Sequence, residues 1–92
     1  MEKIYVLIER AIGDTQGFKG QEHVLLVIKK ESLETKKTRK AIRDAIERDL
    51  GYFGGHDSIM LEEGITQLVG KFKKFRTADD DYLFYLKETD LC

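Results

Sequence analysis

The alternation of apolar and polar residues predicts a β-strand over residues 3–12. Ile4, Val6 and Ile8 fall on one face of this segment, and Tyr5 and Leu7 fall on the other. Apolar residues on both faces indicate a strand that lies inside a sheet rather than at its edge.

A second strand is predicted over residues 22–30, after a glycine-containing loop at 13–21. Strict alternation assigns Val24, Leu26 and Ile28 to one face, and His23, Leu25 and Val27 to the other. The loop is too short to hold a crossover helix. We therefore expect the two strands to pair antiparallel.

The hydrophobic period changes to that of a helix after Ser32, which is a candidate N-cap. The predicted helix covers residues 33–52 and ends at Gly51, Gly54 and Gly55. Its apolar stripe consists of Ile42, Ala45, Ile46, Leu50 and Phe53.

Residues 57–76 allow two interpretations. Apolar residues recur at helical spacing from Leu61 to Phe75, which favours a helix to about Gly70 and places Phe72 and Phe75 in the core. Gly64 and Gly70 oppose a helix, since each costs about 1 kcal/mol in a helix interior. The alternative is a strand at 65–76 that forms a hairpin with the last segment.

A closing strand is predicted at 82–87, where Tyr82, Phe84 and Tyr85 favour β structure. The pattern as a whole predicts an α+β fold, with an N-terminal antiparallel hairpin and a helix on one face of it. A second helix or strand and the closing strand complete a single domain over residues 1–92.

Composition excludes several classes of protein. The chain is 41% hydrophobic and 36% charged, so it carries enough apolar residues to fold. It has no apolar run of the roughly 20 residues that a membrane span needs, and no secretory signal is recognisable. The single cysteine, Cys92, excludes a disulfide framework. These features predict a cytoplasmic protein, or one in the host cytoplasm if it is viral.

Charge is distributed in bands along the chain although the net charge is only −1. Residues 29–43 carry seven basic and two acidic side chains, and residues 64–76 carry four basic side chains and no acidic one. Acidic bands follow at 44–63 and 77–92, and these could neutralise the basic bands in space.

The basic bands supply the candidate binding residues for a protein or a nucleic acid. A first basic cluster consists of Lys36, Lys37, Arg39, Lys40 and Arg43, and a second consists of Lys71, Lys73, Lys74 and Arg76. In the second cluster Phe72 and Phe75 alternate with the cations, a composition in which phosphate contacts and base stacking can combine.

The glycine-containing loop has neither the Walker spacing nor the dinucleotide-binding pattern, and a strand follows it instead of a helix. We interpret it as a long hairpin loop in which Phe18 and Lys19 are candidate contacts with a partner.

No cofactor, metal site or catalytic residue is predicted. His23, His56 and Cys92 lack the spacing of zinc ligands, and the carboxylates at 62–63 and 79–81 lack that of a calcium loop. No nucleophile and base can be paired, so an enzyme is the least supported class.

Three functional hypotheses follow from the sequence. The first is a small protein-interaction module, such as a phage-type inhibitor or adaptor, that binds a host protein through its charged bands and the loop. The second is a nucleic-acid-binding module that uses the two basic clusters. The third is a homo-oligomer that binds a small ligand or nucleotide between its subunits.

Overall fold

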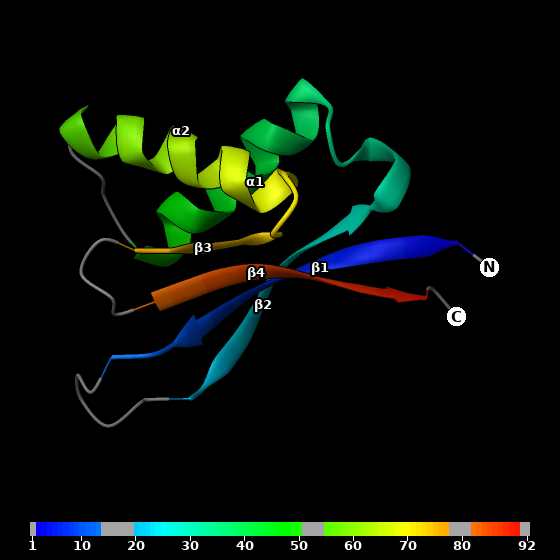
Figure 1. Cartoon of the computed structure of the whole chain (residues 1–92), viewed down its shortest axis with the longest axis horizontal. Helices are drawn as coiled ribbons and strands as arrows, with labels where there is room; N and C mark the ends of the chain where they lie inside the picture. Colours follow the sequence, from blue (N-terminus) through cyan, green and yellow to red (C-terminus); the bar gives the residue numbers. More distant parts are fainter. Residues whose placement is uncertain (1, 14–19, 51–54, 78–81, 91–92) are drawn as a thin grey trace.

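Four strands form one antiparallel sheet in the order β2–β1–β4–β3 (Figure 1). The strands are β1 (Lys3–Ala11), β2 (Glu22–Lys29), β3 (Lys74–Arg76) and β4 (Tyr82–Asp90). A 3₁₀ turn, η2 (Lys30–Ser32), follows β2, and two helices, α1 (Lys36–Leu50) and α2 (Gly55–Val69), lie on one side of the sheet. The computed structural model describes residues 2–13, 20–50, 55–77 and 82–90, and for 55–60 it describes the backbone alone. The predicted α+β fold is confirmed.

The interior position of β1 is also confirmed, because β1 pairs with β2 on one side and with β4 on the other. Leu7 is fully buried on the face that carries the helices. Ile8 is buried on the opposite face, which we call the outer face. Tyr85 lies directly across from Ile8, and its hydroxyl donates a hydrogen bond to Glu22 on β2. This bond raises the pKa of Tyr85 above its usual value, and the two side chains bridge the outer face above β1.

A β-bulge in β2 changes which residues share a face. Leu7 pairs with Leu26 but Ile8 pairs with Val24, so Leu25 is an extra residue in β2. Val24 and Val27 therefore lie together on the outer face. The sequence-based assignment of Val24 to the face of Leu26 and Ile28 is wrong, because strict alternation does not include the bulge.

The helix α1 begins later than the sequence predicted. Ser32 is the last residue of η2, and the N-cap is Thr35, whose Oγ1 accepts a hydrogen bond of 3.2 Å from the Thr38 amide. The predicted apolar stripe is largely confirmed: Ile42, Ala45 and Ile46 are buried and Leu50 is partly buried, while Phe53 lies outside the described residues.

Both interpretations of residues 57–76 are partly correct. The helix α2 continues to Val69, and after a turn β3 forms a short hairpin with β4. Lys73, the last residue of this turn, has a φ of 57°, a left-handed conformation that precedes β3. Phe75 consequently enters the core from a strand and stacks on Phe84, with the ring centres 5.8 Å apart. Phe72 is 73% exposed, so its predicted place in the core is wrong because the helix has already ended.

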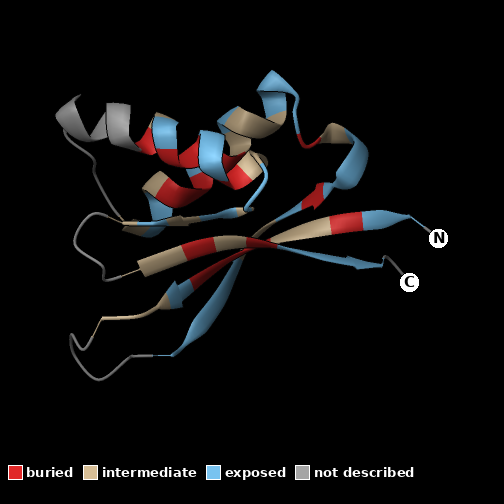
Figure 2. Cartoon of the chain, viewed as in Figure 1, coloured by how far each residue is buried: buried red, intermediate tan, exposed pale blue. Residues whose placement is uncertain are grey.

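The core lies between the sheet and the helices (Figure 2). It consists of Leu7, Ile28, Leu33, Ile42, Ala45, Ile46, Leu61, Ile65, Leu68, Phe84 and Leu86. No helix of the described residues lies on the outer face, and along β2 this face is largely exposed.

Candidate functional site

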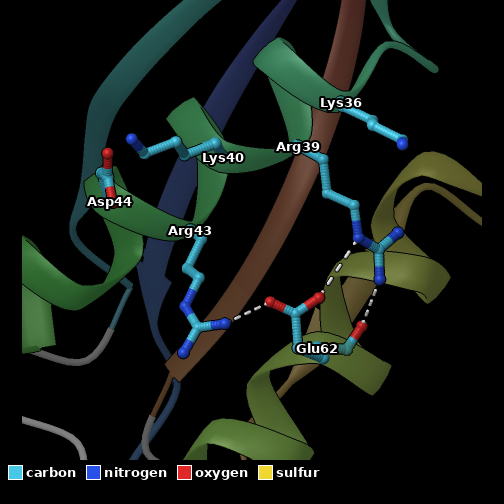
Figure 3. A pocket seen from close by; sticks show the side chains of 6 residues that line it. All are labelled: Lys36, Arg39, Lys40, Arg43, Asp44 and Glu62. Atoms are coloured by element: carbon cyan, nitrogen blue, oxygen red, sulfur yellow. Dashed lines mark hydrogen bonds and ion pairs between the residues drawn. The ribbon is translucent and has the colours of Figure 1, made fainter.

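The first basic cluster lies on α1, and all its residues except Lys37 line the side of this helix that faces α2. Between the two helices is an open hollow of about 400 Å³ (Figure 3). Its lining consists of Lys36, Arg39, Lys40, Arg43, Asp44 and Glu62. Four of the five predicted residues line this hollow, because their spacing along α1 places them on one side of the helix. Lys37 lies outside the hollow.

Glu62 of α2 lies between the two arginines of α1 (Figure 3). Arg39 Nε donates to Glu62 Oε2 at 3.3 Å, and Arg39 Nη2 donates to the Glu62 carbonyl oxygen at 2.8 Å. Arg43 Nη1 donates to Glu62 Oε1. One carboxylate therefore joins the two helices through both guanidinium groups.

Both arginines have further hydrogen-bond partners. Arg39 Nη2 also donates to Thr66 Oγ1 at 2.6 Å, and Arg43 Nε donates to Glu47 Oε1 at 2.9 Å. The bonds to Glu47 and Glu62 raise the pKa of Arg43 above its already high ordinary value. Both arginines are thus directed at acidic side chains of the same chain, and they are less available to an external anion.

The lysines of the first cluster are different. Within the described part of the chain, the ammonium groups of Lys36, Lys37 and Lys40 make no hydrogen bond and no ion pair, and all three residues are exposed. The free positive charge of this surface is therefore carried by lysines. Lysine binds a phosphate as a point charge and lacks the bidentate geometry of arginine.

The residues of the second basic cluster differ in their contacts. Lys73 Nζ donates to the carbonyl oxygens of Gly70 and Val69 and lies 5.9 Å from the centre of the Tyr5 ring. It thereby caps the C-terminus of α2, where a cation is favourable. Lys71 and Lys74 are exposed, and Arg76 has a partner of its own.

The two basic clusters lie on different elements. The first is on α1, and the second is in the turn after α2 and in β3. Phe18 and Lys19, the predicted loop contacts, lie outside the described residues.

Replacing Glu62 with glutamine should strengthen binding of a labelled single-stranded oligonucleotide, because it removes the negative charge between the two arginines. With one added phosphate contact, the slope of log affinity against log salt should become steeper by about 0.7. Fluorescence anisotropy at several salt concentrations measures this slope.

Glu63→Gln is the matched control. Glu63 is exposed on the same helix, and its side chain makes no hydrogen bond or ion pair with a described residue. Equal effects of the two substitutions would show that net charge alone matters, and that Glu62 does not specifically mask the arginines.

No family model, curated protein or solved structure matches the chain. The described residues also contain no group of three or more histidine, cysteine, aspartate or glutamate side chains that could hold a metal ion. None of the helices, within the residues described, is long and apolar enough to cross a membrane.

A surface that the sequence analysis missed lies along β2. Nothing in the described part of the chain pairs with the edge of β2 opposite β1, which we call the β2 edge. Val24 is 65% exposed and Val27 is 57% exposed on this strand. An open strand edge with exposed apolar side chains presents unpaired backbone donors and acceptors to another chain.

Two hollows lie between β2 and α1. One has a volume of about 540 Å³, and its lining includes Val27, Lys29 and Lys37. The other has a volume of about 320 Å³, and its lining includes Val24, Arg48 and Asp49. They could receive the side chains of a strand added to the β2 edge. The sequence signal for this surface was the apolar pattern of residues 22–30, but periodicity alone does not say which strand lies at an edge.

Proposed function

We propose that the chain is a small protein-interaction module that binds an extended segment of a partner along the β2 edge. The observation that carries this proposal is an open strand with two exposed valines and a hollow beside each of them. In strand addition, backbone hydrogen bonds supply affinity and hollows for alternate side chains supply specificity. A module of this kind would act as an inhibitor or adaptor by occupying a protein surface, in the cytoplasm as the sequence predicts.

The two sheet edges support this choice of surface. The opposite edge consists of β3, which is only three residues long and carries Lys74 and Arg76, and of the end of β4 beyond it, which carries Lys87, Glu88 and Asp90. A short, charged strand is a common protection against unwanted pairing. β2 has eight residues and no charge between its ends.

A nucleic-acid-binding module is the second candidate, supported by the exposed lysines of the first cluster. It is the weaker candidate because Glu62 and Glu47 engage the two arginines, and Lys73 is directed at the C-terminus of α2. This leaves fewer phosphate contacts than the sequence suggests, and phosphate contacts supply most non-specific affinity.

Strand addition can be tested with a fluorescein-labelled peptide that alternates valine and threonine over the length of β2. We expect a saturable rise in anisotropy with added protein. The same peptide with N-methyl groups on alternate residues should bind at least about tenfold more weakly, since several backbone hydrogen bonds worth about 1 kcal/mol each are removed.

Two outcomes would contradict the proposal. In one, the methylated peptide binds as tightly as the unmodified one, so that backbone pairing is not involved. In the other, no extended peptide binds while an oligonucleotide does, which would favour the second candidate.

A further inference from the structure

We propose that the partner at the β2 edge is a second copy of this chain, which adds its own β2 antiparallel across a two-fold axis between Leu25 and Leu26. This inference rests on the proposed function, because it names the occupant of the same edge. The observations that carry it are the register of charges along β2 and the position of the bulge.

The register places complementary residues opposite each other. Antiparallel self-pairing that uses all eight residues of β2 is possible in one register only, with Glu22 opposite Lys29 of the second copy. The symmetry repeats this pair, so opposite charges meet at both ends of the interface. Val24 lies opposite Val27 of the second copy, and the exposed apolar side chains of β2 are buried against each other.

The bulge makes this register consistent with the two faces of the sheet. In a regular strand, residues 22 and 29 point to opposite faces, since an odd number of steps separates them. In β2, Glu22 pairs with Arg10 and Lys29 pairs with Ile4, and both of these β1 residues are on the outer face. Because Leu25 is an extra residue, Glu22 and Lys29 lie on the same face of the sheet. Glu22 of one copy can therefore lie beside Lys29 of the other. The backbone hydrogen bonds between the two copies are interrupted at the bulge and continue on either side of it.

The same symmetry brings charged residues of α1 near one another. The hollow at the Val27 end of β2 is lined by Lys29 and Lys37, and the hollow at the Val24 end by Arg48 and Asp49. A two-fold axis at the centre of β2 brings the first hollow of one copy toward the second hollow of the other, and so brings Lys37 toward Asp49, which has the opposite charge, and toward Arg48, which has the same charge.

A cation near Asp49 would act on a carboxylate that lacks a partner among the described residues of its own copy. Asp49 is an exposed residue whose carboxylate has no hydrogen bond and no ion pair within the described residues, and its partial desolvation raises its pKa above the ordinary value. A nearby cation from the second copy would stabilise the charged form. The net charge of −1 also gives little overall repulsion between two copies.

Reversing one charge at a time tests the register. Glu22→Lys should leave only cations at the two ends of β2, and Lys29→Glu should leave only anions, so each variant should dimerise about tenfold more weakly in analytical ultracentrifugation. Mixing the two variants should restore dimers that contain one copy of each. The double variant E22K/K29E should dimerise by itself like the original chain.

Val27→Lys and Phe72→Lys form a matched pair. Both replace an exposed apolar side chain by a cation, at 57% and 73% exposure, but only Val27 lies on the β2 edge. We expect Val27→Lys to yield folded monomers and Phe72→Lys to leave the dimer unchanged. Far-UV circular dichroism establishes that both variants fold.

A chain that stays monomeric at the highest concentration tested would overturn this inference. Unchanged dimerisation of the Val27→Lys variant would also overturn it. So would a mixture of the Glu22→Lys and Lys29→Glu variants that forms no dimers, because the contact between copies would then lie elsewhere. A monomer that still binds the valine–threonine peptide would leave the proposed function intact. Failure of both experiments would reject both proposals.

Discussion

Replacing Phe84 with alanine should lower the free energy of unfolding by about 3–5 kcal/mol, whereas the same change at Phe72 should alter it by less than about 0.5 kcal/mol. Phe84 is fully buried and stacks on Phe75, while Phe72 is 73% exposed. The larger loss combines the apolar surface returned to water with the cavity left between the sheet and the helices.

Urea unfolding followed by circular dichroism measures both variants. Small domains have free energies of unfolding of about 5–15 kcal/mol, so Phe84→Ala should be partly unfolded even without denaturant if this chain is at the lower end. Equal losses of unfolding free energy at the two positions would mean that Phe72 is buried in solution and that α2 does not end at Val69.

The core and most of the elements could be predicted from hydrophobic periodicity, because burial repeats along a regular strand or helix. The interior position of β1 followed from apolar residues on both of its faces, and the buried face of α1 followed from Ile42, Ala45 and Ile46. A prediction from periodicity fails where the regular strand or helix is interrupted. The extra residue Leu25 moved Val24 to the other face of β2, and the end of α2 at Val69 removed Phe72 from the helical stripe.

The candidate site was less predictable, since its properties depend on contacts between distant residues. Glu62 is 19 residues from Arg43 and 23 from Arg39, and only the packing of α2 on α1 brings it between them. The sequence shows an acidic band after a basic one, and so it leaves open whether the two meet. It also does not give the order of strands in the sheet, on which the exposure of the β2 edge depends.

Gly64 provides a test of how α2 packs on β3. Replacing it with alanine should lower the free energy of unfolding by about 1–3 kcal/mol, although alanine is favoured over glycine by about 1 kcal/mol in a helix interior. A Cβ at this position would lie 2.5 Å from atoms of the Phe75 ring. The ring has little room to withdraw, because its other face stacks on Phe84.

The loss should depend on the ring of Phe75. In a Phe75→Ala background, Gly64→Ala should be neutral or should stabilise the protein by up to about 1 kcal/mol, since the propensity gain then acts without the clash. Urea unfolding of the two single variants and the double variant gives this coupling as a double-mutant cycle. Gln67→Ala, an exposed position in α2, is the control and should change stability by less than about 0.5 kcal/mol. If Gly64→Ala stabilises the original chain, Phe75 does not contact α2 as described, and the glycine that appeared unfavourable in the sequence is not required by the fold.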